Sequence, residues 1–239
     1  MTPLRVLAAP IAFDEESKIG SVLDRFNRSD VDEILVLDDG STDRTPEVAR
    51  ARGAKVLTRP RRGGVGKAIR TAMDYARKNG FEVIVILAGN GKDHPQEIPR
   101  LLDPIVNHGY DFVQGSRYLP GGSFGNMPFY RRVATQFVHP LLFSLLTRRR
   151  ITDSTNGFRA YRLSLLNDPR LDLTQPWLNA YELEVYLFFK AIRLGYQVKE
   201  VPVTKIYPPH ELGYTKMKPL TGWWSILRPL VFLGLGLKK

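Results

Sequence analysis

The sequence predicts an α/β fold in which a mostly parallel, doubly wound sheet carries helices on both faces. Short apolar runs rich in β-branched residues alternate with amphipathic segments through the first half of the chain, and this alternation is typical of parallel strands joined by covering helices. The composition agrees, because 239 residues that are 43% hydrophobic and 25% charged suit one globular domain. The chain contains no cysteine, which excludes thiolate catalysis, cysteine-ligated metal sites and a disulfide scaffold.

The expected elements follow one another in a regular order up to residue 116. Strands are expected at residues 5–12, 33–37, 54–58, 83–87 and 111–115. Helices are expected between them at residues 17–27, 45–52, 66–79 and 98–107. The later part is expected to hold a loop at 119–128, a long apolar helix at 130–146, an amphipathic helix at 181–194 and a strand at 197–203. We therefore expect one domain over residues 1–218, followed by a C-terminal helix within 219–239.

The net charge of +11 is concentrated in two stretches of the chain. Residues 128–170 hold eight basic and two acidic side chains, and residues 204–239 hold six basic and one acidic side chain. Residues 1–127, in contrast, are nearly neutral, with 18 basic and 17 acidic side chains. A local excess of this kind indicates an anionic partner, for which nucleic acid, a phosphorylated substrate and an anionic membrane surface are the candidates. Nucleic acid is not expected, because the basic stretches contain no recognition module and acidic strand ends would repel phosphates.

Acidic clusters follow the first two expected strands. The first is Phe13-Asp14-Glu15-Glu16 and the second is Asp38-Asp39-Gly40-Ser41-Thr42-Asp43. A turn with a helix N-cap explains either cluster on its own. In a doubly wound sheet, however, the ligand lies beyond the carboxyl ends of the strands. Carboxylates placed there are able to accept hydrogen bonds from ribose hydroxyls or from a base edge.

These clusters open a series of six motifs along the chain. The other five are Gly63-Gly64-Val65-Gly66-Lys67-Ala68; Gly115-Ser116-Arg117-Tyr118 with Gly121-Gly122; Asp153-Ser154-Thr155-Asn156-Gly157-Phe158-Arg159; Leu194-Gly195-Tyr196 with Glu200-Val201-Pro202-Val203; and Gly213-Tyr214-Thr215-Lys216. Taken together over nearly all of residues 5–218, the series resembles the family 2 glycosyltransferases with a GT-A fold. Within that family it is most similar to the branch of the dolichyl-phosphate mannosyltransferases and polyprenyl-phosphate glycosyltransferases.

The resemblance implies an inverting enzyme that moves a sugar from a nucleotide-sugar donor, linked to UDP or GDP, to a polyprenyl phosphate. It also implies that the reaction takes place at the cytoplasmic face of a membrane. Two alternatives stay open: a related transferase that acts on a glycan or another hydroxyl acceptor, and a nucleotide-binding pseudoenzyme. Whether a membrane partner protein is required also stays open.

Candidate site residues follow from the resemblance and from the charges near the strand ends. Those expected to bind the donor nucleotide are Phe13, Glu15, Asp39, Lys67, Asn90 and Lys92. Those expected in catalysis are Arg117, Asp153 and Lys216, and those expected at the acceptor or its phosphate are Arg131, Arg159 and His210. Asp153 is expected to orient a phosphate acceptor, which is already ionised at neutral pH, but to act as the base for a hydroxyl acceptor. The histidines show no metal-ligand spacing, and His139 is expected at the surface or at a helix end.

The largest departure from the family pattern is at its metal site. The family carries an Asp-x-Asp after the fourth strand, whose carboxylates hold a divalent ion such as Mg²⁺ or Mn²⁺ against the diphosphate, but those positions are Ala88 and Asn90 here. Asn90 and Asp93 are the remaining candidate ligands, although Asp93 also suits the N-cap of the next helix. Lys92 offers another solution, because a fixed ammonium is able to neutralise part of the diphosphate. We therefore predict weak or absent metal dependence.

The C-terminal segment 223–237 is strongly apolar but contains Arg228 and Pro229. A charge and a helix-breaking residue near its middle argue against a transmembrane span. We expect this segment to lie along an anionic membrane surface, with a core-packing helix as the alternative. The protein is accordingly expected to be cytoplasmic and peripheral on the cytoplasmic face of the membrane.

Overall fold

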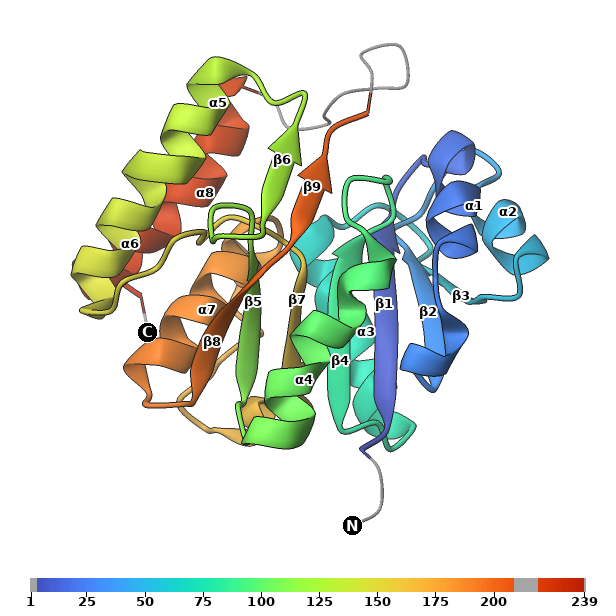
Figure 1. The fold of residues 1–239 in the computed structure, drawn as a ribbon, viewed down its shortest axis with the longest axis horizontal. Helices are drawn as coiled ribbons and strands as arrows, with labels where there is room; N and C mark the ends of the chain where they lie inside the picture. The colour runs from blue at the N-terminus through green and yellow to red at the C-terminus, as the bar shows by residue number, and fades with distance from the viewer. Residues whose placement is uncertain (1–3, 209–218, 239) are drawn as a thin grey trace.

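The structure of the protein is a computed structural model that describes residues 4–208 and 219–238. The strands of its central sheet are β1 (Val6–Ala12), β2 (Glu33–Asp38), β3 (Lys55–Thr58), β4 (Val83–Ala88), β5 (Phe112–Ser116), β7 (Arg159–Arg162) and β8 (Val198–Pro202). They lie in the order β3-β2-β1-β4-β7-β5-β8 (Figure 1). Neighbouring strands run parallel except at β7, which is antiparallel to both β4 and β5.

Helices cover both faces of the sheet, so the core forms two layers. Successive residues of β1 serve different layers, because Leu7 and Ala9 pack in one and Val6 and Ala8 in the other. This double burial explains why the strand is apolar throughout. The helices of the first layer include α3 (Val65–Lys78) and α7 (Glu182–Arg193), and those of the second are α1 (Glu16–Asp24), α2 (Thr45–Ala51) and α4 (Ile98–His108). The expected fold class is confirmed, and so is each element expected before residue 116.

Three strands lie outside the expected alternation. β7 is inserted between β4 and β5, and β6 (Ser123–Gly125) pairs in parallel with β9 (Thr204–Ile206) in a separate two-stranded sheet. The sequence did not indicate these strands, because segments of three or four residues carry no periodic pattern and their partners are distant along the chain. Short 3₁₀ turns are η1 (Arg28–Asp30), η2 (Pro95–Glu97), η4 (Leu163–Asn167) and η5 (Pro176–Leu178).

The expected long helix at 130–146 is a continuous helical arm of three parts. These are α5 (Phe129–Val133), a π-helical turn η3 (Ala134–Val138) and α6 (His139–Thr147). Pro140 accounts for the π-helical turn, because its nitrogen has no hydrogen to donate to the carbonyl one turn earlier. The arm ends at Arg148, which takes a left-handed φ of +54°.

The C-terminal helix α8 (Pro219–Gly234) packs against α7 and the helical arm (Figure 1). Leu230 is 3% exposed and belongs to the core layer that contains α7. Arg228 forms an ion pair with the buried Glu182 at 2.5 Å, so its charge is matched within the protein. Trp224, in contrast, is 51% exposed. Within the described ranges, none of the helices combines the length and the apolar character needed to cross a membrane.

Candidate functional site

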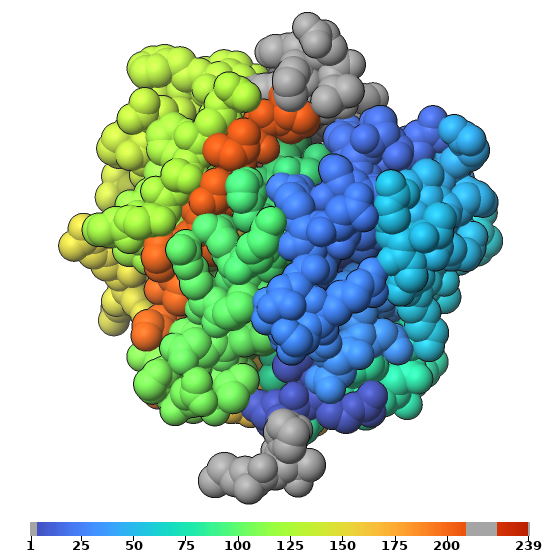
Figure 2. All heavy atoms as spheres, turned by 45° about the vertical axis from the view of Figure 1, so that its right-hand side comes forward, coloured from blue at the N-terminus to red at the C-terminus, as the bar shows by residue number. Residues whose placement is uncertain are grey.

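A cavity of about 320 Å³ opens at the carboxyl ends of β1 and β4. Its other walls come from the loops after β2 and β3, the helical arm, the segment 154–159, the start of α7, and β9. It therefore lies at the edge where an open α/β sheet binds its ligand. Figure 2 shows the orange segment with β8 and β9 passing between the yellow-green helical arm and the green and blue first half of the chain.

The predicted site residues fall into three groups. Those that line the cavity are Phe13, Asp39, Asn90, Lys92, Arg117, Arg131 and Arg159. Those that the structure describes elsewhere are Glu15, Lys67, Asp93 and Asp153, and those outside the described residues are His210 and Lys216. The ring of Phe13 lies 4.2 Å from the guanidinium carbon of Arg62. The carboxylate of Glu15 is paired with Lys18 at 2.5 Å.

Asp39 follows β2 and organises the glycine loop after β3. Its carboxylate accepts hydrogen bonds from the amides of Gly63 at 3.1 Å and Gly64 at 2.8 Å, and it pairs with Arg59. Gly64 has a φ of +95°, and a Cβ there would lie 2.5 Å from the carbonyl oxygen of Asn179, so this position requires glycine. Asp39 is 3% exposed and still lines the cavity. One buried carboxylate thus fixes a loop in the cavity wall.

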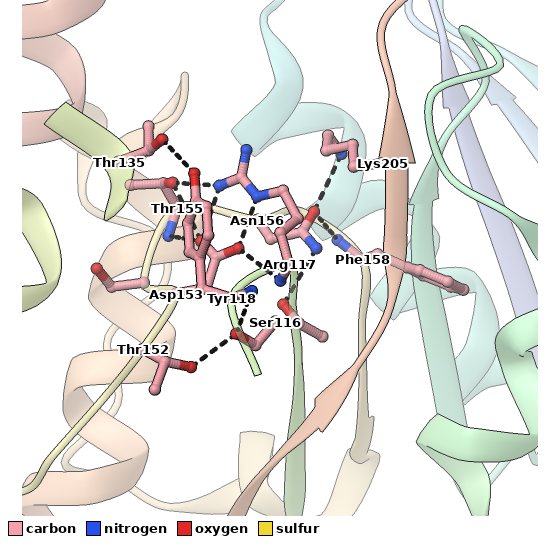
Figure 3. Close-up of polar contacts among 12 residues, drawn as sticks. Ser116, Arg117, Tyr118, Thr135, Thr152, Asp153, Thr155, Asn156, Phe158 and Lys205 are labelled. Atoms are coloured by element: carbon pink, nitrogen blue, oxygen red, sulfur yellow. Dashed lines mark hydrogen bonds and ion pairs between the residues drawn. The ribbon is translucent and has the colours of Figure 1, made fainter. Parts of the chain in front are cut away.

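Arg117 and Asp153 form a buried ion pair beside the cavity (Figure 3). Nε and Nη2 of Arg117 donate to the two carboxylate oxygens at 2.6 and 2.8 Å, and the Arg117 amide donates at 3.1 Å. Nη2 also donates to Thr155 at 2.8 Å. Burial disfavours both charges, but the attraction between the two groups outweighs the effect of burial. The pKa of Arg117 is therefore raised and that of Asp153 is lowered.

These contacts give Asp153 a positioning role. Arg117 is among the residues lining the cavity, whereas Asp153 is not. The amide of Asp153 donates to Glu200 of β8 at 2.9 Å, which ties the ion pair to the sheet. A carboxylate whose pKa is lowered by a bound guanidinium is a weak base. Asp153 is therefore suited to hold Arg117 in place rather than to remove a proton.

Asp93, the second candidate metal ligand, is turned into the protein. It is fully buried, its Oδ1 accepts from Nζ of Lys205 at 2.5 Å, and its Oδ2 accepts from the Ala88 amide at 2.8 Å. Lys205 also donates to Oδ1 of Asn156 at 3.0 Å (Figure 3). The sequence did not single out Lys205. A lysine two residues after the expected strand 197–203 is nevertheless a usable signal, because ligands bind at that edge.

The described residues do not fit a divalent metal ion. Nowhere in residues 4–208 and 219–238 do three His, Cys, Asp or Glu side chains gather in a group able to hold one. Asn90 lines the cavity with Ala88, but the Oδ1 of Asn90 accepts from the amide of Lys92 at 3.3 Å. The ammonium groups of Lys92 and Lys205 line the same cavity and repel a cation. The ligand set that Mg²⁺ and Mn²⁺ prefer is therefore incomplete.

Lys92 lies in the cavity wall beside Tyr207. Its Nζ is 4.7 Å from the centroid of the Tyr207 ring, and the guanidinium carbon of Arg131 is 5.3 Å from the same centroid. Lys92 is only 7% exposed. Burial lowers the pKa of Lys92, and the nearby charges of Lys205 and Arg131 lower it further, to about 7. An anion bound beside Lys92 would have the opposite effect.

Arg159 shares the cavity with Glu184 of α7. Nη1 of Arg159 donates to the Glu184 carbonyl at 2.7 Å, and Nη2 lies 3.6 Å from the Glu184 carboxylate. Burial lowers the pKa of Arg159 and raises that of Glu184. A Cβ at Gly157 would lie 2.8 Å from Oε1 of Glu184, so glycine makes room for the pair. The sequence did not indicate Glu184, because a glutamate on an amphipathic helix is usually solvated.

His139, at the start of α6, is 3% exposed, so the alternative of a surface position was wrong. Its Nδ1 lies 2.7 Å from Oγ of Ser154, and its Nε2 lies 3.1 Å from the carbonyl oxygen of Ile226. A carbonyl only accepts, so Nε2 carries the proton and Nδ1 accepts from the Ser154 hydroxyl. Burial lowers the pKa of His139 to about 4, which keeps the ring neutral at pH 7. His139 thereby connects α8 to the segment that follows Asp153.

Known proteins similar in sequence include a polyprenol monophosphomannose synthase and a dolichyl-phosphate hexose transferase. The chain is 37% identical over 190 residues to the polyprenol monophosphomannose synthase of Mycolicibacterium smegmatis, covering 77% of this chain and 69% of that protein. It is 34% identical over 227 residues to the dolichyl-phosphate hexose transferase of Haloferax volcanii, and the match covers 92% of this chain and 89% of that protein.

Solved structures and a family model also match this protein. The glucosyl-3-phosphoglycerate synthase of Mycobacterium tuberculosis, solved with Mn²⁺, uridine diphosphate and phosphoglyceric acid, has a TM-score of 0.67 and 25% identity, covering 95% of this chain and 78% of that one. The model described as Glycosyl transferase family 2 matches residues 11–168, which include Phe13, Asp39 and Arg117 of the cavity. The protein therefore belongs to glycosyl transferase family 2 and has the GT-A fold.

Proposed function

We propose that the protein transfers a hexose from a UDP- or GDP-linked donor to a polyprenyl phosphate at the cytoplasmic face of a membrane. The names of its relatives, which act on polyprenol and dolichyl phosphates, support this class of acceptor. The observation that carries the proposal is a cavity lined by Phe13 and Asp39 on one side and by Arg117 and Arg131 on the other. Arg131 belongs to the helical arm, which also exposes a row of apolar side chains.

The proposed reaction inverts the anomeric carbon. An oxygen of the acceptor phosphate forms a bond to this carbon while the bond to the donor diphosphate breaks on the opposite face. The electron pair of the broken bond stays on the diphosphate, so cations beside it stabilise the transition state. A phosphate acceptor is ionised at neutral pH and needs no strong base. This requirement agrees with an Asp153 that is bound to Arg117 and has a lowered pKa.

We propose that the helical arm faces the membrane. Its exposed apolar side chains are Phe129, Tyr130, Phe137, Val138, Leu141, Leu142 and Leu145. They are between 41% and 78% exposed, and a row of this kind on a soluble surface is typical of an interaction site. Arg132 and the arginines 148–150 are also exposed at the two ends of the arm, which suits an anionic leaflet. Trp224 on α8 and Leu235, directly after it, are exposed and support a role of this end of the chain at the same surface.

We further propose that transfer depends weakly, if at all, on Mg²⁺ or Mn²⁺. A relative of known structure holds Mn²⁺ or Mg²⁺ together with UDP. In this chain Ala88 and Asn90 offer no carboxylate, and the carboxylate of Asp93 is engaged by Lys205. The same feature supports a nucleotide-binding pseudoenzyme as the second candidate, because family members that lose ligands can lose activity.

Transfer of labelled sugar tests these proposals. Purified protein is incubated with UDP- and GDP-hexoses, with and without polyprenyl phosphate in detergent, and the label in the organic phase is counted. Label that enters the organic phase only with polyprenyl phosphate supports the proposal and shows that no partner protein is required. Label on an added glycan instead favours the hydroxyl-acceptor reaction. Binding of the donor without any transfer favours the pseudoenzyme.

A further inference from the structure

Three cationic side chains from distant parts of the sequence meet in the cavity. Lys92 comes from the loop after β4, Arg131 from α5 and Lys205 from β9. Lys92 and Arg131 both lie against the ring of Tyr207, at 4.7 and 5.3 Å from its centroid. Lys205 is held by Asp93 and Asn156, so its position is fixed before any ligand binds. We refer to Lys92, Arg131 and Lys205 as the cation cluster.

Lys92 and Lys205 together carry more positive charge than the buried carboxylate of Asp93 can balance. Asp93 is fully buried and contacts Lys205 at 2.5 Å. Lys92 is 7% exposed, and in the part of the chain that the structure describes it makes no ion pair with a carboxylate. A buried ammonium without a partner is unfavourable because it has lost its hydration. The cavity is therefore electrostatically prepared for an anion.

The position of Lys92 identifies which anion fits. The loop after β4 meets the end of β1, so Lys92 and Asn90 line the same cavity as Phe13 and Asp39 on the nucleotide side. The group attached to a bound nucleoside on that side is its phosphate chain. A divalent ion does not fit there, because both oxygens of Asp93 already accept hydrogen bonds and the neighbouring ammonium groups repel it.

We propose that the cation cluster receives the diphosphate of the donor nucleotide and takes the place of the divalent metal ion. This proposal rests on the proposed function, since a diphosphate is the ligand only if the donor is a nucleotide-sugar. In the reaction, the bond between the anomeric carbon and the diphosphate oxygen breaks and its electron pair remains on the diphosphate. The cluster stabilises that charge, and no proton has to move when the acceptor phosphate is ionised.

Calorimetric titration of the full chain with UDP, GDP, UMP and GMP, in EDTA and in Mg²⁺, tests the cluster directly. The diphosphate of the preferred base is expected to bind equally in both buffers, within about threefold, and at least about tenfold more tightly than its monophosphate. Lys92→Ala is expected to reduce this diphosphate advantage to below about threefold while monophosphate binding is retained, which also shows that the variant is folded. Lys78→Ala removes the same charge from an exposed position on α3 and is expected to change nothing.

A second variant tests the converse, that carboxylates at these positions make diphosphate binding depend on a metal ion. Ala88→Asp with Asn90→Asp and Lys92→Ala restores the carboxylates of the family and removes the ammonium, so diphosphate binding is expected to become dependent on Mg²⁺. The proposal is overturned if the natural protein binds the diphosphate tightly only in Mg²⁺, or if Lys92→Ala behaves like Lys78→Ala. If no nucleotide binds in either buffer, the proposed function itself fails. If the nucleotide binds but only with metal, the proposed function stands and the cation cluster fails.

Discussion

The two sides of the cavity handle charge differently. On the nucleotide side, the carboxylate of Asp39 is closed off by Arg59 and loop amides, and Glu15, which does not line the cavity, is paired with Lys18. This side presents the ring of Phe13, with the guanidinium carbon of Arg62 4.2 Å from its centroid. On the opposite side, buried carboxylates hold cations in place and leave a positive excess. This difference supports the proposal that the base and the ribose bind at the first side and the phosphates at the second.

The carboxylates of the second side work through the cations that they hold. Asp153 fixes Arg117 with two side-chain hydrogen bonds, and Asp93 fixes Lys205 with one. Both carboxylates are fully buried. Cations that are already oriented lose little entropy and need little reorganisation when charge develops on a phosphate. Substitutions on either side of the cavity test this comparison. The largest effects on stability and activity are expected where a buried ion pair is broken.

The largest effect is expected at Arg117. Arg117→Ala removes a cavity cation and leaves Asp153 buried without its partner, which is expected to cost about 3–5 kcal/mol of unfolding free energy. Transfer is expected to fall by at least about a hundredfold, because an oriented donor to the phosphates is lost. Urea denaturation and the transfer assay measure the two effects.

Two matched variants separate stability from activity at this pair. Arg117→Met with Asp153→Asn removes both charges and is expected to regain most of the stability but none of the activity. Arg170→Ala breaks a pair whose arginine is 61% exposed, and it is expected to cost less than about 1 kcal/mol. If the double variant transfers sugar at the natural rate, Arg117 has no role at the phosphates.

On the nucleotide side, Asp39→Ala is expected to weaken nucleotide binding by at least about a hundredfold, which corresponds to about 2.7 kcal/mol. The reason is that the glycine loop loses the carboxylate that accepts its amides at 2.8 and 3.1 Å. The thermal shift produced by UDP or GDP measures the loss, and circular dichroism checks the fold. Asp24→Ala, on the surface of α1, is the control. Unchanged nucleotide affinity in a folded Asp39→Ala protein would remove this residue from the donor site.

The same two sides explain what the sequence was able to predict. The nucleotide side is built at the ends of consecutive strands, where apolar runs mark the strands and acidic clusters mark their ends. The acidic clusters could be found in this way, and the resemblance to the family then pointed to Phe13 and Asp39 within them. The second side is assembled from β9, the helical arm and the segment after Arg150, whose neighbours are distant in sequence. Lys205 and His139 are buried and Glu184 lies against the buried Arg159, and nothing local to these residues in the sequence indicated these positions.

Chemical reasoning predicted the type of some contacts but not their partners. The missing carboxylates at Ala88 and Asn90 were visible in the sequence, whereas the engagement of Asp93 by Lys205 depends on a bridge between the loop after β4 and β9. Similarly, the sequence pointed to Asp153 but not to its three hydrogen bonds with Arg117. Arg228 was expected to be an obstacle to membrane insertion, and the structure adds that it anchors α8 through Glu182.

A smaller effect is expected from His139, which links α8 to the second side of the cavity. Its pKa is lowered to about 4, so the unfolded chain binds more protons than the native protein between about pH 4 and pH 6.5. Stability from this group is therefore present above pH 6.5 and is lost on acidification, by about 2 kcal/mol between pH 7 and pH 5. Denaturation curves at the two pH values measure this loss.

The histidine contribution is isolated by two substitutions. His139→Gln is expected to abolish the loss of unfolding free energy that this histidine causes between pH 7 and pH 5. This holds whether or not the substitution changes stability at pH 7. His108→Gln, at a side chain that is 56% exposed, serves as the control and should leave the pH dependence as it is. A His139→Gln protein with the full natural pH dependence would show that other groups cause the acid sensitivity.

The smallest effect is expected at the helical arm, where single charges meet a membrane surface. Arg132 is exposed on α5, and Arg132→Gln is expected to weaken binding to anionic liposomes by about 1 kcal/mol, or roughly fivefold. Leu141→Ser, at a side chain that is 60% exposed, is expected to weaken binding to anionic and neutral liposomes alike, because it removes apolar area rather than charge. Flotation measures both variants, with Lys78→Gln on α3 as the control. If the Lys78→Gln and Arg132→Gln proteins float equally with anionic liposomes, the charge of Arg132 does not contact the leaflet, and the proposal that the arm faces an anionic membrane loses this support.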